Sequence, residues 1–211
     1  MFPSLIWNIQ GAGKTIYLTF DDGPHETATT FVLDELNKYN AKATFFCIGK
    51  NVLTLSNIYN RILKEGHAVG NHTFNHLNGW KTDDETYIND IDNASQLINS
   101  NLFRPPYGRI KRSQAKKIQL RKTKLKLLSN ATPSTQYPSP FKIIMWDVLS
   151  GDFDIELSPE KCLANVLQNA TNGSIIVFHD STKALERMSH ALPKVLEHFS
   201  KQGFVFKQIA F

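Results

Sequence analysis

Long apolar runs are absent from this sequence of 211 residues. No stretch approaches the ~20 apolar residues that a membrane-spanning helix needs. The first ten residues, MFPSLIWNIQ, also lack the basic start and apolar centre of a secretory signal peptide. We therefore expect no transmembrane segment. The missing signal favours a cytoplasmic location, and a cell-envelope location follows if a leader has been trimmed from the chain.

Cysteine is nearly absent as well. Cys47 and Cys162 are the only two, and they form no metal-ligand spacing, so we expect two reduced, buried thiols. The hydrophobic fraction of 41% and the charged fraction of 20% are ordinary for a soluble globular protein. No repeat or linker divides the chain, which predicts one domain over residues 1–211.

Acidic residues are missing from residues 93–146, which hold 11 of the 24 lysines and arginines. The centre of this stretch, KRSQAKKIQLRKTKLKLL, has no interleaved aromatic residue for stacking on bases, so we expect no nucleic-acid partner. We interpret residues 111–140 as a basic, proline-containing insertion, formed by a solvated helix face and a loop over residues 131–140. Attraction to an anionic polymer is the alternative.

Short apolar strands alternate with longer helical patterns. Strands are predicted at residues 15–20, 43–47, 67–70, 102–104, 142–146, 174–178 and 204–207. Helices are predicted at residues 26–39, 84–99 and 185–199, the last kinked or broken near Pro193, and one more begins after the cap residue Ser158. This alternation predicts an α/β fold with a mostly parallel sheet of about seven strands. It is an incomplete (β/α) barrel or an open doubly wound sheet.

The segment GAGKTIYLTFDDGP, residues 11–24, allows two interpretations. Its start resembles the end of a phosphate-binding loop, and its end resembles two carboxylates at a strand terminus. A phosphate loop needs a glycine five positions before Gly13, where Asn8 stands, and it needs a helix to follow. The residues after Lys14 predict a strand instead. We therefore interpret the glycines as a turn and Asp21-Asp22 as the reactive part.

Polar side chains follow five of the predicted strands. They are Asp21 with Asp22, Asn71 with His72 and His76, Arg104 with Tyr107, Asp147 with Asp152, and His179 with Asp180. Catalytic groups at the carboxyl ends of parallel strands are typical of a (β/α) barrel, so we expect one active site at this rim.

A divalent metal site is predicted at this rim. The i, i+4 spacing of His72 and His76 places two imidazoles on one side of a helical turn. With one aspartate they form a ligand set that suits zinc or a similar ion and leaves positions open for water and substrate. Asp21 and Asp22 point differently, so one can bind the metal and the other can act as a base.

Two further residues fit an acid/base site. Arg104 is a candidate to hold the free carboxylate ionised and oriented. His179 follows a buried strand and could be a core residue or a catalytic acid. As an acid it needs a partner that raises its pKa and fixes its tautomer, and Asp152 is available.

Together these segments resemble, in order, the motifs of the polysaccharide deacetylases of the NodB-homology type, carbohydrate esterase family 4. The full matches are TFDDGP at residues 19–24, HTFNH at 72–76 and RPPYG at 104–108. Residues 146–153 match the fourth motif in part, and VFHD at 177–180 is close to the fifth. The resemblance covers most of the chain and implies the NodB-type deacetylase fold, an incomplete (β/α) barrel.

The resemblance also implies a role for each residue. Asp21 is implied as the general base oriented by Arg104, Asp22 with His72 and His76 as metal ligands, the Tyr107 N–H as an oxyanion donor, and His179 as the general acid tuned by Asp152. Phe153 stands where the family usually has Trp, Val177 where it has a Leu that lines the acetyl pocket, and Leu149 where it has Asp. We expect Phe153 and Val177 to contact substrate and these changes to alter substrate preference.

The implied activity is a metal-dependent hydrolase that removes acetyl groups from N-acetylated sugars of a peptidoglycan- or chitin-like polysaccharide. The expected metal is zinc, with cobalt or nickel as alternatives. An esterase for O-acetyl groups, as in acetylated xylan, and a non-catalytic glycan-binding protein stay open. The expected partner is an N-acetylated oligo- or polysaccharide, and the oligomeric state stays open.

Overall fold

Nine strands form one sheet in this protein, whose structure is a computed structural model that describes residues 4–11, 13–120 and 140–211. The strands are β1 Leu5–Ile6, β2 Thr15–Asp21, β3 Thr44–Cys47, β4 Ala68–Asn71, β5 Leu102–Phe103, β6 Lys142–Ile144, β7 Val148–Leu149, β8 Ile175–His179 and β9 Val205–Phe206. Their order is β1-β6-β5-β4-β3-β2-β8-β7, with β9 paired to β2, and every ladder is parallel.

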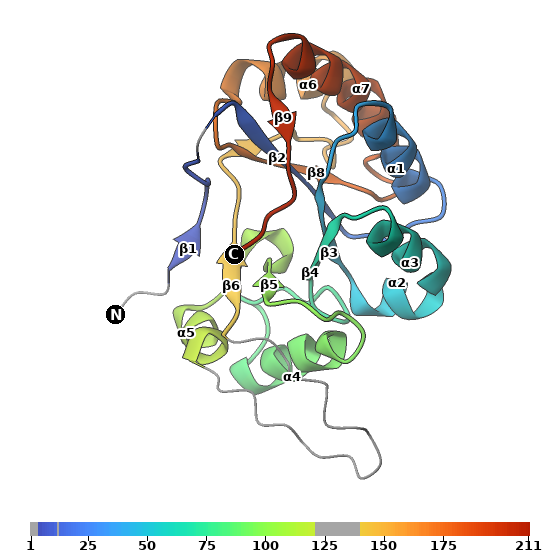
Figure 1. The fold of residues 1–211 in the computed structure, drawn as a ribbon. Coiled ribbons are helices and arrows are strands. Elements are labelled where there is room, and N and C mark those ends of the chain that lie inside the picture. The colour runs from blue at the N-terminus through green and yellow to red at the C-terminus, as the bar shows by residue number, and fades with distance from the viewer. Residues whose placement is uncertain (1–3, 12, 121–139) are drawn as a thin grey trace.

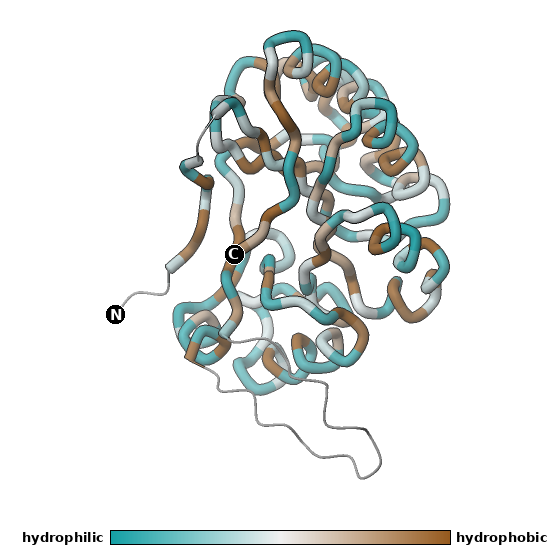
Figure 2. The backbone as a smooth tube through the Cα atoms, in the orientation of Figure 1, coloured by the Kyte–Doolittle hydropathy of each residue, from teal (hydrophilic) through white to brown (hydrophobic). Residues whose placement is uncertain are grey.

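Helices cover the outside of the curved sheet (Figure 1). They are α1 Ala28–Lys38, α2 Gly49–Thr54, α3 Ser56–Lys64, α4 Asp84–Ser95, α5 Arg112–Leu120, α6 Pro159–Asn169 and α7 Leu185–Lys201, with a 3₁₀ turn η1 at Pro106–Gly108. Apolar and polar residues alternate along these helices, as expected when one face packs on a sheet (Figure 2). The core cluster joins β2, β3 and β8 to α1 and α7 through Phe20, Phe45, Phe178, Leu33 and Leu192.

The predicted α/β architecture, an incomplete barrel of parallel strands, is confirmed. The sheet curls but does not close, because β1 and β7 are its two ends and do not pair with each other. Parallel pairing places Asp21 of β2 opposite His179 of β8, and Asn71 of β4 opposite Cys47 of β3. The carboxyl ends of the central strands therefore meet at one rim, which is where the predicted site residues lie.

The number of strands differs from the seven expected. β1 and β7 were not predicted, because two residues are too few to show a periodic pattern. The strand expected at residues 142–146 ends at Ile144, and the chain then crosses the open side of the barrel, where β7 pairs with β8 rather than with β5. The helices α2 and α3 were not predicted either, whereas α5 lies where a helix face was expected in the basic segment.

Helix ends differ from prediction by a few residues, and one expected break is absent. The helix expected to end at residue 99 ends at Ser95, and α7 runs unbroken through Pro193 to Lys201. Ser158 caps α6 as predicted, since its Oγ accepts a hydrogen bond from the Lys161 N–H at 3.2 Å. The segment interpreted as a basic insertion includes α5, whereas residues 121–139 of it, with most of the loop expected at 131–140, lie outside the described residues.

Three smaller expectations are also resolved. Gly13 and Lys14 form a bend that leads into β2 rather than into a helix, which rules out the phosphate loop. Cys47 and Cys162 are free and buried, as predicted. In the described part of the chain, every helix is too short or too polar to cross a membrane.

Candidate active site

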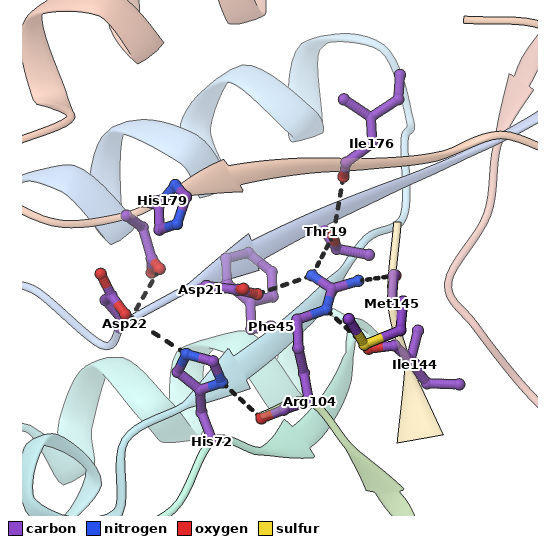
Figure 3. A network of polar contacts seen from close by, with 12 residues as sticks. Thr19, Asp21, Asp22, Phe45, His72, Arg104, Ile144, Met145, Ile176 and His179 are labelled. Atoms are coloured by element: carbon purple, nitrogen blue, oxygen red, sulfur yellow. Dashed lines mark hydrogen bonds and ion pairs between the residues drawn. The ribbon is translucent and has the colours of Figure 1, made fainter. Parts of the chain in front are cut away.

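The two adjacent aspartates at the end of β2 point to different partners. Asp21 is the last residue of β2, whereas Asp22 has a left-handed backbone with a φ of 82°. Oδ1 of Asp21 accepts a hydrogen bond from Nη1 of Arg104 at 2.8 Å. Oδ1 of Asp22 lies 3.1 Å from Nε2 of His76 and 3.6 Å from Nε2 of His72. The backbone reversal thus separates the two carboxylates into two environments (Figure 3).

His72 and His76 lie in the loop after β4, and the helical turn expected for them is wrong. Residues 72–76 form a bend in which Thr73 and His76 have left-handed φ values of 64° and 58°. The two imidazole rings nevertheless come together, with their centroids 5.1 Å apart. Four of the five non-glycine residues with positive φ in the described chain lie in the site loops, namely Asp22, Thr73, His76 and Tyr107. Such clustering of strained backbone is typical of functional sites.

Asp22, His72 and His76 form a group suited to a metal ion, with ligand atoms all within 4.8 Å of one another. Nδ1 of His72 must donate to the Arg104 carbonyl, 2.8 Å away, so in the neutral ring the lone pair of Nε2 is left for a cation. Oδ1 of Asp22 is buried and lacks a hydrogen-bond partner among the described residues. Burial acts to raise the pKa of Asp22, but His72 and His76 outweigh it and hold the pKa well below its usual value. The donor set therefore fits a divalent cation.

Arg104 is fully buried and holds Asp21 from below the site. Its guanidinium donates to the carbonyls of Ile144 and Met145, at 3.1 and 2.7 Å, and to Oγ1 of Thr19 at 2.6 Å, in addition to Asp21 (Figure 3). It also stacks on Phe46, with Cζ 4.2 Å from the ring centroid. This planar network fixes the position of the Asp21 carboxylate.

His179, the last residue of β8, is paired with Asp152. Nδ1 of the ring donates to Oδ1 of Asp152 at 2.7 Å, and the His179 backbone N–H donates to Oδ2 at 2.7 Å. Burial disfavours the charged ring, but Asp152, with smaller contributions from Asp21 and Asp22, raises the pKa of His179 to about 9. The ring is thus protonated at neutral pH, and Nε2 is left to donate a proton.

The other predicted site residues fall in three different positions. Tyr107 is 59% exposed in η1, and its ring packs at a tilt against His76, with ring centroids 4.6 Å apart. Phe153 is 39% exposed, and its ring packs in an edge-to-face arrangement with the His179 ring, with ring centroids 5.2 Å apart. Val177 is fully buried in β8, between Thr19 and Leu149 of the neighbouring strands. Substrate contacts of Phe153 and Val177 stay predictions.

Asp147 does not join the site, contrary to expectation. Its carboxylate accepts hydrogen bonds from the Ile175 N–H at 2.8 Å and from Oγ of Ser174 at 3.2 Å. Ile175 is the first residue of β8 and Ser174 precedes it, whereas His179 is the last, so Asp147 lies at the opposite end of the strands from the site. The early end of β6 at Ile144 explains the error, because Asp147 is part of the crossing segment and not of the catalytic rim.

Two buried aspartates support the site loops and were missed as positioning residues. Asp90 of α4 accepts hydrogen bonds from the N–H groups of Phe74 and Asn75, at 3.0 and 2.9 Å, and from Nδ2 of Asn75 at 2.6 Å. Asp180 accepts hydrogen bonds from the Gly23 N–H at 3.0 Å and from the Thr29 hydroxyl. Asp90 thereby braces the histidine loop, and Asp180 braces the turn after Asp22.

The packing around Asp180 explains the glycine of the TFDDGP segment. A Cβ atom at Gly23 would lie 2.1 Å from Oδ2 of Asp180, so no larger residue fits there. Burial, together with the charge of Asp22, raises the pKa of Asp180 to about 8. A pocket of about 370 Å³ opens above this turn and is lined by Asp22, His25, Ile48, Asn51, His76, Phe153, Asp180, Ser181, Thr182 and Lys183.

Comparison with known proteins identifies the family. Residues 8–124 match the family described as polysaccharide deacetylase. A peptidoglycan-N-acetylglucosamine deacetylase of Bacillus cereus is 32% identical over 210 residues, which cover 97% of this chain and 90% of the relative. The chain belongs to the polysaccharide deacetylase family. A crystal structure of a peptidoglycan N-acetylglucosamine deacetylase superposes with a TM-score of 0.82 at 30% identity, covering 97% of this chain and 90% of that one.

Relatives within the polysaccharide deacetylase family also occur as parts of larger proteins. A bifunctional xylanase/deacetylase of Pseudobutyrivibrio xylanivorans is 33% identical over 204 residues, which cover 93% of this chain but 30% of that protein. The resemblance in sequence implies three departures from the family pattern, at Leu149, Phe153 and Val177. Leu149 is 42% exposed and Phe153 is 39% exposed, whereas Val177 is fully buried. Phe153 lines the pocket beside His76.

Proposed function

We propose that this protein is a zinc-dependent deacetylase that hydrolyses the acetamide of an N-acetylated sugar in a peptidoglycan- or chitin-like polysaccharide. The observation that carries the proposal is the separation of Asp21 from Asp22. One carboxylate is held by a buried arginine and is free to move a proton, whereas the other faces two histidines in a metal-ligand arrangement. A hydrolase that uses a metal and a separate base needs both environments side by side.

Asp22, His72 and His76 would hold the metal. When bound, a divalent ion polarises the substrate carbonyl and lowers the pKa of water, which is the chemistry that amide hydrolysis at neutral pH requires. Two imidazole nitrogens and one carboxylate favour zinc, and cobalt and nickel suit the same ligands. The hydrogen bond from Nδ1 of His72 to the Arg104 carbonyl orients the ring for this role.

The proton transfers fall to Asp21 and His179. Asp21, fixed by Arg104, takes a proton from the attacking water as general base. His179 is protonated at neutral pH because of Asp152, and it donates that proton to the amine as the carbon–nitrogen bond breaks. The backbone N–H of Tyr107, set by a left-handed φ of 60°, would donate to the developing oxyanion.

The substrate is inferred from relatives and from the pocket. Relatives of high similarity are named peptidoglycan-N-acetylglucosamine deacetylases. The pocket of about 370 Å³ beside His76 and Phe153 is in the range of small-ligand sites and has room for one acetylated sugar. We infer an N-acetylglucosamine residue of a longer glycan as the substrate unit.

Two other functions are weighed against this one. The relative with xylanase and deacetylase activities favours an O-acetyl esterase as the second candidate, because the same water attack also cleaves an ester. A purely glycan-binding protein would have no need of the buried Arg104–Asp21 and His179–Asp152 pairs together with a metal-ligand group. Burying such charged pairs is costly, and a binding role alone gives no reason for them.

The test is the product formed from two acetylated polymers. The zinc-loaded protein is incubated with an N-acetylglucosamine tetramer and with O-acetylated xylan, and both acetate and new free amine are quantified. We expect acetate and amine in equal amounts from the tetramer and a lower rate on xylan. Acetate from xylan alone would establish the esterase. The proposal would be overturned if the protein released no acetate from the tetramer, from xylan or from peptidoglycan.

A further inference from the structure

Two exposed side chains beside the site are held together in a fixed arrangement. Trp80 is 60% exposed, yet its indole N–H donates to the Ile110 carbonyl at 3.2 Å, which fixes the ring. The guanidinium of Arg109 lies over this ring, with Cζ 5.1 Å from the ring centroid. Arg109 is itself exposed, and it has no carboxylate partner among the described residues. The pair presents an aromatic surface and an uncompensated positive charge to solvent.

The two loops that carry this pair are braced from inside the protein. Gln114 of α5 is fully buried and donates to the carbonyls of Gly79 and Thr82, at 3.0 and 3.1 Å. Its Oε1 accepts a hydrogen bond from the Lys111 N–H at 2.9 Å, so one side chain ties both loops together. A Cβ atom at Gly79 would lie 2.5 Å from the Arg109 carbonyl oxygen, which shows how closely the loops pack. An exposed tryptophan on such a rigid support is preorganised for binding.

The pair lies close to the reacting groups. Arg109 is two residues after Tyr107, whose ring packs against His76, so the Arg109 Cα lies within about 8 Å of the Tyr107 Cα. Trp80 is four residues after His76, within about 15 Å by the same reasoning. The pair is therefore close enough to contact a glycan chain that extends from the metal-ligand group.

Resting on the proposed function, we propose that Trp80 and Arg109 form a second sugar-binding subsite that selects an acidic glycan. The apolar face of a pyranose ring packs on the Trp80 indole, and a carboxylate on that same sugar pairs with the Arg109 guanidinium. Arginine in a planar, exposed position next to an aromatic ring matches a carboxylate better than it matches a hydroxyl group. The proposal thus favours a polymer with carboxylate-bearing sugars over a neutral, chitin-like one.

The test measures binding rather than turnover, so that it does not depend on the proposed reaction. Titration calorimetry compares an N-acetylglucosamine tetramer with a tetrasaccharide in which alternate N-acetylated sugars carry a carboxylate. We expect the wild type to prefer the acidic glycan about tenfold, Arg109→Gln to remove that preference, and Trp80→Ala to weaken both glycans about tenfold. Raising the salt concentration reduces the preference of the wild type.

Matched controls are Trp7→Ala and Lys64→Gln, which remove another exposed tryptophan and another exposed cation and are expected to bind like the wild type. An acid preference that persists in Arg109→Gln, or affinities that Trp80→Ala does not lower, would overturn the subsite. Acetate release is measured on the same samples. Selective binding without acetate release would leave the subsite standing and overturn the proposed reaction, whereas release without selectivity would do the reverse.

Discussion

Oδ1 of Asp21 lies 2.8 Å from Nη1 of Arg104, and both side chains are almost completely removed from solvent. A buried ion pair of this kind is weak as a source of stability, because desolvation of both charges offsets their attraction. Its value here is positional. The guanidinium engages four acceptors at once and therefore leaves the Asp21 carboxylate one orientation next to His179 and the turn that carries Asp22.

Replacing Arg104 with lysine is expected to damage both stability and activity. A lysine ammonium has three donors on a flexible stem and cannot reach the four acceptors that the planar guanidinium serves. We expect Arg104→Lys to lower the free energy of unfolding by about 3 kcal/mol, since a buried network loses its geometry. Acetate release by the folded fraction should fall at least tenfold, because Asp21 is no longer held.

The control for this variant is Arg61→Lys. Arg61 also bonds two carboxylates, Asp34 and Glu65, but its side chain is 35% exposed. Exposed pairs contribute about 0–1 kcal/mol, so the free energy of unfolding should change by less than that, with no change in activity. Urea titration gives the free energy of unfolding of each variant. Equal effects of the two substitutions would show that Arg104 has no special role.

The pair of Asp152 and His179 leads to a prediction about pH. The catalytic acid must be protonated, so its pKa sets the alkaline side of the rate profile. Asp152 raises the pKa of His179, and Asp152→Asn removes that charge, so the pKa falls. The alkaline limb of kcat/KM should therefore move to lower pH, while the acidic limb stays in place. An unchanged alkaline limb would mean that another group supplies the proton.

The sequence predicted that the candidate residues gather at one rim because each lies at the end of a strand or in the loop after it. Asp21, Asp22, His72, His76 and His179 all follow strands whose apolar patterns are clear. The geometry between the histidines was predicted for the wrong reason. An i, i+4 spacing fits a helical turn, but left-handed residues at positions 73 and 76 bring the rings together equally well, and no residue type at those positions announces them.

Supporting residues were harder to predict than reactive ones. Asp90 stands in a helix with four acidic residues, and the sequence alone gives no sign that this one is buried while Glu85 is exposed. Its role depends on how α4 packs against the histidine loop, which is a tertiary contact. The same reason explains the wrong prediction for Asp147. Its sequence position after a predicted strand suggests the catalytic rim, but the crossing of the chain after β6 places it at the opposite end of the strands.

Asp90→Asn is expected to weaken zinc binding by about 10–100-fold without removing a ligand, which is the usual effect of losing a residue that orients ligands. The carboxylate accepts three hydrogen bonds from the loop of His72 and His76, and an amide would place an N–H group against one of those donors. Competition with a chromophoric chelator measures the affinity. Glu85→Gln, an exposed acid on the same helix, is the control, and equal affinities in both variants would contradict the role.

The division of labour between Asp21 and Asp22 is tested most directly by the zinc content and acetate release of Asp21→Asn, measured on the same preparation. An asparagine keeps the shape of the side chain but cannot accept the proton of the attacking water. We predict that the variant retains one zinc ion per chain and releases acetate at least about 100-fold more slowly than the wild type. Zinc lost together with activity, or acetate release at the wild-type rate, would contradict the account.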